Sequence, residues 1–381
     1  MDVMKEKWRN ENSIYYTFSI KVVKRIFLSV YLNLLDFLLF NAGKYTAMSL
    51  LFIAVVILSA MLCADSQLTE KPNVVVAQDG SGDFQTIAEA ILAAPNRSVE
   101  RYYIRIRQGT YREYIQVNKT KTNIVLIGEG MDSTIITGNK SFGGGIQTYK
   151  TATVGVLGNG FTAQDITFRN DAGPENHQAV AIRVEADFAS FYRCRFEGYQ
   201  DTLYTKKNRQ FYRDCEVYGT IDFICGDAAA LFQNCLIEVR VPLPRQYNTI
   251  TAQKREFDEP IETGIVLQNC TIKATQDLEK MENVMTYLGR PWGNFSKTVV
   301  MESHIDHLIN PKGWIEFTNK SLVHPFYLEY KNRGPGAVTD GRVKWASVTS
   351  DPNVVSNFTV RHFINGDKWI PPNIPHYLDF S

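Results

Sequence analysis

The stretch Ser190-Phe191-Tyr192-Arg193-Cys194-Arg195-Phe196 carries the pattern on which the fold prediction depends. It recurs in variant form at three later places: Gln210-Phe211-Tyr212-Arg213-Asp214-Cys215-Glu216-Val217, Leu231-Phe232-Gln233-Asn234-Cys235-Leu236-Ile237 and Val266-Leu267-Gln268-Asn269-Cys270-Thr271-Ile272. The cysteines of these segments are 21, 20 and 35 residues apart. Short aromatic or β-branched strands that are separated by Gly, Asn or Asp turns and recur about every twenty residues are typical of a parallel β-helix.

A single coil of such a fold cannot bury its inward side chains, so stacked coils must share one core. Equivalent positions then stack, which predicts that Cys194, Cys215 and Cys235 line one face. The 35-residue interval predicts a longer excursion over Arg240–Glu262 that projects beside the coils. The spacing alone leaves a β-sandwich with similar strand lengths as an alternative.

The ends of a solenoid must be covered. Apolar residues at helical spacing over Asp83–Ala94 predict a short helix that caps the N-terminal end of the coils. The C-terminal segment contains Pro371, Pro372 and Pro375, which predicts an irregular tail packed along the coils.

Length and composition favour one large domain, 65–381, behind an N-terminal segment, 1–64. The 381 residues are 44% hydrophobic and 21% charged, as in an ordinary globular protein, and β architectures often exceed 250 residues as one domain. The net charge is +1; residues 1–64 carry +3, which leaves −2 for the rest. A near-neutral body gives no support for nucleic-acid binding, and an anionic polymer would have to be attracted by a local cleft.

The N-terminal segment contains the uncharged run Thr46–Ala64, which follows Lys44. Its length permits a membrane span, whereas the small residues at Cys63-Ala64 are typical of a signal-peptidase site. Three interpretations follow: a signal that begins near Met48 behind an extension, a long cleaved leader, or an uncleaved signal anchor. All three deliver the body to the secretory lumen, so we expect a secreted protein that touches a membrane only if this segment is uncleaved.

Two further counts favour that compartment. Asn-X-Ser/Thr sequons, which mark N-glycosylation sites, occur at Asn96, Asn118, Asn139, Asn269, Asn294, Asn319 and Asn357. Five cysteines follow Cys63, an odd number, so at least one is a free thiol or pairs externally. No CxxC pair occurs, which argues against a zinc site, and no metal or cofactor is expected.

Two carboxylates are the strongest candidates for chemistry. Asp201 lies in Gln200-Asp201-Thr202-Leu203-Tyr204, and Asp222 follows it by 21 residues, about one coil, in Gly219-Thr220-Ile221-Asp222-Phe223-Ile224. Both lie among apolar residues, and a buried carboxylate is costly unless it is paired. A simpler interpretation of either aspartate is a turn cap at a strand end. Arg290 and Trp292 downstream and Gln178 upstream would complete a hydrolytic site without a metal.

Five blocks of the sequence resemble plant pectinesterases (pectin methylesterases), in the order of that family and near its spacing. They are Gly109-Thr110-Tyr111-Arg112-Glu113, Gln178-Ala179-Val180-Ala181, Gln200-Asp201-Thr202-Leu203-Tyr204, Asp222-Phe223-Ile224 and Gly289-Arg290-Pro291-Trp292. The resemblance runs from Pro72 to the C-terminus and implies a right-handed parallel β-helix, which decides against the sandwich. It implies that the protein hydrolyses pectin methyl esters. It also implies the short type of pectinesterase, because the inhibitor-like N-terminal region of many relatives does not fit before Pro72.

Ester hydrolysis needs a nucleophile, an acid and stabilisation of the oxyanion. Asp222 is the expected nucleophile, kept ionised and oriented by Arg290. Asp201, beside a second carboxylate and apolar groups, is the expected proton donor and later the base that activates water. Gln178 and Gln200 are expected to donate to the oxyanion. The resemblance implies the same roles.

Substrate contacts are expected from two sources. The resemblance implies that Thr148, Gln178, Arg290 and Trp292 contact pectin, the polysaccharide substrate. Flat apolar platforms for sugar rings are the further candidates Tyr204, Phe223 and Trp314.

The resemblance also implies a Cys235–Cys270 disulfide, whereas Cys194 and Cys215 are left open and Cys225 is expected to be a buried thiol near the cleft. Four positions depart from the family pattern: Cys225 where Phe is common, Asp227 where Asn is common, Gly293 where Lys is frequent, and Phe317 where Trp is common. Asp227 adds a third carboxylate that could raise the local negative potential.

The expected partners are pectin and a proteinaceous pectinesterase inhibitor, and the expected state is a monomer in the cell wall. Two alternatives stay open. One is a polygalacturonase or lyase on the same fold, against which the Gly289-Arg290-Pro291-Trp292 block argues. The other is a catalytically silent wall protein that binds pectin.

Overall fold

The strands of the computed structural model form three parallel sheets. Successive strands along the chain enter the first, the second and the third sheet in turn. The structure describes residues 71–317 and 323–381, and these belong to one compact unit. The domain boundary predicted at 64/65 and the signal or anchor interpretations of Thr46–Ala64 lie outside the described residues. No helix within the described ranges has the length and apolar character needed to cross a membrane.

The largest sheet has eleven strands in the order β1-β2-β5-β8-β11-β14-β17-β20-β23-β25-β26. Their bounds are β1 Val74–Val76, β2 Tyr102–Ile106, β5 Ile124–Ile127, β8 Thr162–Gln164, β11 Ala189–Tyr192, β14 Arg209–Arg213, β17 Ala229–Gln233, β20 Gly264–Gln268, β23 Lys297–Met301, β25 Phe326–Tyr330 and β26 Ser347–Thr349.

The second sheet has eight strands in the order β24-β21-β18-β15-β12-β9-β6-β3. Their bounds are β3 Gly109–Arg112, β6 Thr134–Gly138, β9 Thr167–Asn170, β12 Arg195–Glu197, β15 Glu216–Gly219, β18 Leu236–Val239, β21 Thr271–Ala274 and β24 His304–Ile305.

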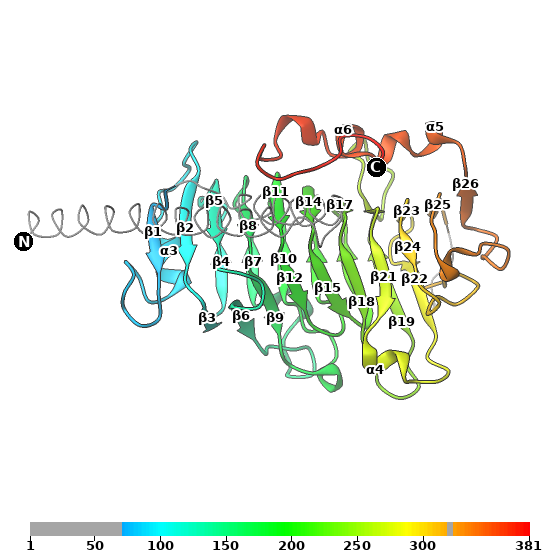
Figure 1. The fold of residues 1–381 in the computed structure, drawn as a ribbon, viewed down its shortest axis with the longest axis horizontal. Coiled ribbons are helices and arrows are strands. Elements are labelled where there is room, and N and C mark those ends of the chain that lie inside the picture. Colours follow the sequence, from blue (N-terminus) through cyan, green and yellow to red (C-terminus); the bar gives the residue numbers. More distant parts are fainter. Residues whose placement is uncertain (1–70, 318–322) are drawn as a thin grey trace, which may run out of the picture. The chain divides into compact units, whose positions relative to one another are not determined.

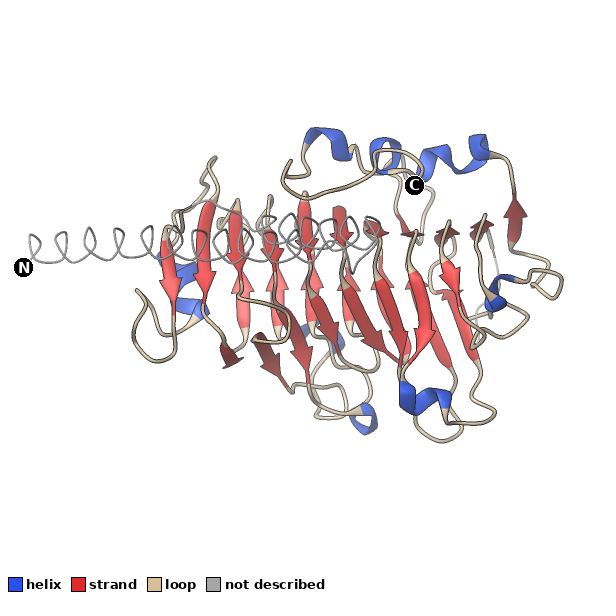
Figure 2. Ribbon diagram, viewed as in Figure 1, coloured by secondary structure: helices blue, strands red, loops and turns tan. Residues whose placement is uncertain are grey.

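The third sheet has seven strands in the order β22-β19-β16-β13-β10-β7-β4 and carries most of the predicted site. Their bounds are β4 Ile115–Val117, β7 Val154–Val156, β10 Ile182–Val184, β13 Leu203–Thr205, β16 Ile221–Gly226, β19 Asn248–Gln253 and β22 Thr286–Pro291. From β2 to β24 the strands therefore join the three sheets in a fixed rotation (Figure 2). This arrangement confirms the parallel β-helix that the repeat predicts and the right-handed form that the family resemblance implies.

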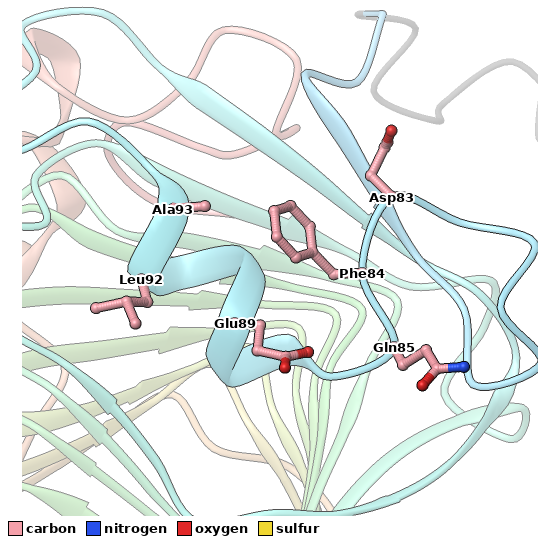
Figure 3. Close-up of a pocket in the computed structure, with 6 residues that line it drawn as sticks. All are labelled: Asp83, Phe84, Gln85, Glu89, Leu92 and Ala93. Carbon is pink, nitrogen blue, oxygen red and sulfur yellow. The ribbon is translucent and has the colours of Figure 1, made fainter. Parts of the chain in front are cut away.

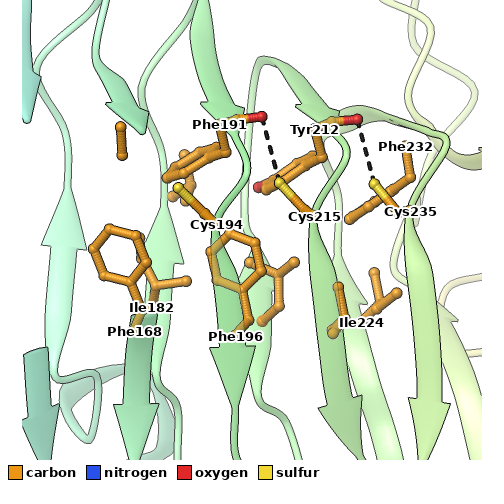
Figure 4. Close-up of a cluster of buried hydrophobic side chains, with 14 of the residues drawn as sticks. Phe168, Ile182, Phe191, Cys194, Phe196, Tyr212, Cys215, Ile224, Phe232 and Cys235 are labelled. Atoms are coloured by element: carbon orange, nitrogen blue, oxygen red, sulfur yellow. Dashed lines mark hydrogen bonds between the residues drawn. The ribbon is translucent and has the colours of Figure 1, made fainter. Parts of the chain in front are cut away.

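The corner between the eleven- and eight-stranded sheets explains the cysteine repeat. Arg193, Asp214, Asn234 and Asn269 have φ of 49°, 50°, 58° and 50°, and each turns the chain just before a cysteine. Asn and Asp tolerate this left-handed region better than most residues, which accounts for their recurrence there. The cysteines point into the core and stack from coil to coil, as predicted (Figure 4).

The predicted Cys235–Cys270 disulfide is not formed: all five cysteines of the described residues are free, buried thiols. The Cys235 thiol donates to the Tyr212 carbonyl of the preceding coil at 3.5 Å, and the Cys270 thiol donates to the Phe232 carbonyl at 3.5 Å. The ladder of thiols thus satisfies its polar groups with backbone oxygens, and the small side chains leave room for the stacked rings of Tyr212 and Phe232, whose centroids are 4.3 Å apart.

The predicted N-terminal cap is α3, Ile87–Ala93, shorter than the predicted range. Thr86 is its N-cap and accepts a hydrogen bond from the Glu89 amide. The Ile87 and Ala88 amides donate to the Glu113 carboxylate, both at 3.0 Å. These bonds satisfy amides that a helix start leaves unpaired, so the helix begins here with its apolar side on the end of the core.

The predicted excursion over Arg240–Glu262 is wrong in its middle, because it contains β19. This strand pairs with β16 on one side and β22 on the other and so belongs to the regular coil. The additional residues form two connections, 240–247 and 254–263, on either side of it. Alternating Thr and apolar residues in Asn248–Gln253 were the signal for a strand.

The C-terminal tail covers the outer face of the eleven-stranded sheet, as predicted (red in Figure 1). It contains the short helices α5, Pro352–Val355, and α6, Val360–Phe363. Val355, Phe358 and Phe363 pack with Phe211 and Leu231 in a second apolar cluster. A further helix, α4, Gln276–Glu279, follows β21.

Candidate active site

The outward side chains of the seven-stranded sheet form a row that crosses five strands. Pairing places Arg183, Tyr204, Cys225, Ala252 and Arg290 in register on successive strands. The preceding residues of two of these strands, Leu203 and Ile224, point into the core, because side chains alternate across a strand. Two of the predicted site residues, Tyr204 and Arg290, therefore lie on the same outer face.

Asp222 lies on a β-bulge of β16. Ile221 pairs with Thr249 and Ile224 pairs with Thr251, so β16 contains one more residue than β19 between these two pairs. Asp222 takes up this irregularity with φ of 52°. A bulge redirects a side chain, and here it holds the carboxylate with only 10% of its side chain exposed.

The bulge also overturns the prediction that Phe223 contacts substrate. Phe223 is fully buried in the main core. A Cβ on Gly219 would lie 2.1 Å from the Cβ of Phe223, so that glycine makes room for the ring. Phe223 is a core residue that anchors the strand next to Asp222.

The Asp222 carboxylate is held by three donors. Arg290 donates from Nε to Oδ1 at 2.8 Å and from Nη2 to Oδ2 at 2.6 Å. Thr249 donates from Oγ1 to Oδ1 at 2.7 Å, while its hydroxyl oxygen accepts from the Asp222 amide at 3.0 Å. A two-pronged guanidinium contact favours the ionised carboxylate and fixes its orientation.

Arg290 is itself supported on two sides. Its Nη1 donates to the Tyr247 hydroxyl at 3.2 Å, and its Cζ lies 4.4 Å from the centroid of Phe317. Burial alone would lower the pKa of Arg290, but the hydrogen bond to Asp222 and the nearby negative charges together outweigh it, so the pKa is raised. The guanidinium therefore stays charged and cannot act as an acid.

Asp201 follows β12 and precedes β13, with φ of 60°. Its amide donates to the Ile221 carbonyl at 3.1 Å, which ties it to the residue before Asp222. Burial raises the pKa of Asp201 well above its usual value, the negative charge of Asp222 raises it further, and Arg290 opposes the shift. Within the described residues no hydrogen bond to its carboxyl group is recorded, so only the charge of Arg290 favours the ionised form, against burial and Asp222.

Gln178 and Gln200 lie side by side on neighbouring coils. They form an isolated parallel bridge, in which the Ala179 amide donates to the Gln200 carbonyl at 3.1 Å. Both side chains are partly exposed. Gln200 adjoins Asp201 in the chain, so the two glutamines and Asp201 all lie in the segments just before β10 and β13.

Trp292 and Tyr204 provide an aromatic surface. Their ring centroids are 6.4 Å apart with the planes inclined by 42°, and both side chains are partly exposed. The Lys254 ammonium lies 4.2 Å from the centroid of Trp292. The two rings form an aromatic surface of the kind that packs against sugar rings; their contact with substrate stays a prediction.

Thr148 lies in a 3-10 helix, Thr148–Lys150, within the loop after β6. The Phe142 amide in the same loop donates to the Gln178 carbonyl at 2.8 Å, and the Arg183 guanidinium donates to the Tyr149 carbonyl. The loop therefore packs against the strand end that carries Gln178.

The prediction that Trp314 contacts substrate is wrong. Its side chain is fully buried, its Nε1 donates to Glu329 Oε1 at 3.2 Å, and its ring packs edge-on against Tyr327 at 4.8 Å. Phe317, three residues later, is the aromatic residue of this segment that meets Arg290. A β-bridge between Gly289 and Trp314 aligns the segment, so that Trp314 turns inward.

The remaining departures from the family pattern have local partners. Cys225 is a buried thiol in the row, as predicted; burial and then the charges of Asp201 and Asp222 raise its pKa, whereas Lys254 lowers it. Asp227 Oδ1 accepts from Thr263 Oγ1 at 2.6 Å and from Gln253 Nε2 at 3.2 Å. Asp227 thus binds side chains of the next coil, at the end of β19 and just before β20.

Sequence reasoning missed three residues that touch the site: Thr249, Tyr247 and Lys254. All three lie in or beside β19, inside the stretch predicted to be an excursion. The Thr-Ile-Thr alternation at 249–251 could have placed Thr249 on a strand, but the bond to Asp222 depends on the bulge.

The structure also has a hollow at the N-terminal end, beside α3 (Figure 3). It is lined by Asp83, Phe84, Gln85, Glu89, Leu92 and Ala93. None of the predicted site residues lies there, and its walls are mostly apolar atoms of the capping helix. The hollow is separate from the carboxylate pair.

The fold and the paired aspartates define a class: parallel β-helix proteins with a carboxylate pair and an arginine on one outer sheet face. The family model described as Pectinesterase matches residues 73–367. The chain belongs to the pectinesterase family.

Individual relatives and solved structures support the same family. "Pectinesterase 2" of Citrus sinensis is 52% identical over 314 residues, which is 81% of this chain and 61% of that protein. The structure titled "Pectin methylesterase from Carrot" superposes with a TM-score of 0.80 at 46% identity and covers 82% of this chain and 100% of its own. A pectin methylesterase solved "in complex with hexasaccharide VII" has a TM-score of 0.67 at 26% identity, covering 80% of this chain and 100% of that one. The chain spans 61%, 54% and 58% of the first three curated relatives it matches.

Proposed function

We propose that this protein hydrolyses the methyl esters of pectin (homogalacturonan) and releases pectate and methanol. The observation that carries the proposal is the Asp222 carboxylate, clamped by Arg290 at 2.8 and 2.6 Å beside a second carboxyl group whose pKa is raised. An ionised and a protonated carboxyl group side by side are what an ester hydrolase without a metal needs.

In the first half-reaction, a carboxylate oxygen of Asp222 attacks the ester carbonyl carbon. The carbonyl π electrons move to its oxygen and give a tetrahedral oxyanion. Arg290 and Thr249 keep the attacking carboxylate ionised and oriented, which lowers the entropic cost of reaching the carbon.

The amide groups of Gln178 and Gln200 donate to the developing oxyanion. No hydrogen bond from either side-chain amide is recorded within the described residues, and both side chains are partly exposed, so their N–H groups are available to a ligand. Donors that are already aimed at the developing charge stabilise the transition state more than the ground state.

Asp201 supplies the proton on which the departure of the alcohol depends. As the oxyanion collapses, the bond to the methoxy oxygen breaks and Asp201 protonates that oxygen, which leaves as methanol. The raised pKa of Asp201 keeps the proton available. The product on the enzyme is a mixed anhydride between Asp222 and the galacturonate.

In the second half-reaction, the ionised Asp201 takes a proton from water and the hydroxide attacks the anhydride. The acyl bond breaks, Asp222 leaves as a carboxylate and the free galacturonate is released. Asp201 is protonated again, so the cycle closes without a cofactor.

The substrate is a polysaccharide that lies across the outer face of the seven-stranded sheet. Trp292 and Tyr204 offer ring faces to pyranose units, and Thr148 lies in the loop packed beside Gln178. The related structure titled as a hexasaccharide complex supports an extended carbohydrate ligand. The names of several relatives include a pectinesterase inhibitor, and we propose that such a protein also binds this chain.

The proposed location is the cell wall, where the protein acts as a monomer after secretion. The sequons and the uncharged run at Thr46–Ala64 support this proposal. Sequencing the N-terminus of protein recovered from the wall tests it. A start near Asp65 supports cleavage, whereas full-length protein retained in alkali-washed membranes supports an anchor.

Methanol release from highly methylated pectin tests the activity. We expect methanol without new chain ends. New reducing ends would indicate a polygalacturonase, unsaturated ends a lyase, and pectin binding without either product a silent wall protein.

A further inference from the structure

A lysine that the mechanism does not use lies on the aromatic surface of the site. Lys254 Nζ is 4.2 Å from the centroid of Trp292, and its side chain is partly exposed. No carboxylate within 4.0 Å of this ammonium is recorded in the described residues. A cation over an indole ring is held by the ring's quadrupole and keeps its hydrogen-bond donors free for another group.

The register of β19 and β22 fixes this position. Ala252 pairs with Arg290, so two residues further along, Lys254 comes beside Trp292. Because side chains two residues apart share a face of a strand, Lys254 lies on the face that carries Arg290. Its amide donates to the Gly226 carbonyl at 2.8 Å, which continues the strand pairing past the end of β19.

Gly293 permits the close approach of the two segments. A Cβ at this position would lie 2.2 Å from the Arg255 carbonyl oxygen and 2.7 Å from the Lys254 carbonyl carbon. Any side chain at 293 would therefore displace the backbone that carries Lys254 away from Trp292.

Three other cations of this face already have anionic partners. Arg290 is paired with Asp222 at 2.6 Å. Arg183 and Lys206 share Glu185, at 3.1 and 3.2 Å. Asp227, which follows the Gly226 carbonyl bonded to Lys254, accepts a hydrogen bond from Thr263, and Glu256 accepts one from Asn294. Lys254 therefore offers a ligand on Trp292 a positive charge that Arg290, Arg183 and Lys206 already direct to carboxylates.

We propose that Lys254 determines substrate specificity by binding the free carboxylate of a galacturonate unit that stacks on Trp292. This inference rests on the proposed function. A unit carries that carboxylate only after its methyl ester has been removed, so Lys254 directs hydrolysis to esters near units that are already demethylated. An ammonium–carboxylate hydrogen bond is stronger than one to a neutral ester.

The test compares two homogalacturonans, one fully methylated and one half methylated, as substrates for wild type, Lys254→Gln and Lys254→Arg. We expect wild type to have a higher kcat/KM for methanol release on the half-methylated substrate. Lys254→Gln should lower the ratio of the two kcat/KM values about tenfold, mainly through KM, since a hydrogen bond to a charged group contributes about that factor. Lys254→Arg should restore most of the ratio, and added salt should reduce it in wild type.

Lys273→Gln is the matched control, because it also removes a partly exposed lysine but lies on β21 of the eight-stranded sheet, 3.7 Å from Glu238. Its ratio should equal that of wild type. An unchanged ratio in Lys254→Gln, or an equal shift in the control, overturns the inference.

A binding measurement separates this inference from the proposed activity. Calorimetric titration with a fully demethylated oligogalacturonate should give a Kd about tenfold weaker for Lys254→Gln than for wild type. Equal affinities overturn the role of Lys254 whether or not methanol is released. Absence of methanol from wild type on both substrates overturns the proposed function alone.

Discussion

Replacing Arg290 by alanine removes the cation that holds the Asp222 carboxylate in a nearly dry site. The two side chains are 11% and 10% exposed, and the lost contacts are hydrogen bonds of 2.8 and 2.6 Å. Thr249 would remain as the only recorded side-chain donor to that carboxylate in the described residues. Removing one partner of a buried ion pair costs about 3–5 kcal/mol, because an uncompensated charge is left behind. We expect Arg290→Ala to lose free energy of unfolding in this range and to lose methanol release.

Urea unfolding followed by circular dichroism measures the loss. Arg169→Ala is the control, since Arg169 pairs with Glu197 at 2.5 Å but is 33% exposed on the outer face of another sheet. A pair with this exposure contributes about 0–1 kcal/mol. If Arg290→Ala unfolds within about 1 kcal/mol of wild type, the Asp222 site is wetter than the structure indicates and the account of an arginine-held nucleophile fails.

Three further outcomes follow from the structure. Burial raises the pKa of Asp201 above its value in the unfolded chain, so protonated Asp201 stabilises the folded state at low pH, and this stabilisation is lost as the pH rises through the folded-state pKa. Asp201→Asn should therefore gain stability relative to wild type as the pH rises from acid to neutral, while it loses activity. A stability difference that does not depend on pH would contradict this. Phe223→Ala should lose about 3–5 kcal/mol of unfolding free energy as a core truncation, whereas the partly exposed Tyr204→Ala should mainly raise KM; the reverse order would return Phe223 to the substrate surface. Alkylation after denaturation without reductant should label Cys194, Cys215, Cys225, Cys235 and Cys270, and recovery of a linked Cys235–Cys270 peptide would contradict the free-thiol ladder.

The stacking of the coils could be predicted from the sequence because the number of residues between repeats is read directly from the sequence. No knowledge of tertiary contacts is needed for that count. The interval between Cys194 and Cys215 is one coil, and inward positions one coil apart must stack. The same argument placed Asp201 and Asp222 one coil apart on one face. Arg290 was predicted as their partner from the Gly289-Arg290-Pro291-Trp292 block. It lies 68 residues after Asp222, and the coil repeat does not relate the two positions.

The errors have a common physical cause, which is strand register. Phe223 was expected outside as a flat apolar platform for a sugar ring, but the bulge in β16 next to it breaks the regular alternation, and Phe223 lies in the core. Trp314 was expected outside for its size and chemistry, yet its bridge to Gly289 turns it inward. Thr249 and Lys254 were missed because β19 was taken as part of an excursion. Bulges and bridges depend on tertiary contacts, so local sequence does not report them.

The most direct test of the central claim is methanol release by Asp222→Ala on highly methylated pectin, with circular dichroism to verify the fold. The account predicts a native spectrum and methanol at the level of the enzyme-free control, because neither water nor a neighbouring group replaces the covalent nucleophile. Activity comparable to wild type in a natively folded Asp222→Ala protein would contradict it and would show that another group attacks the ester.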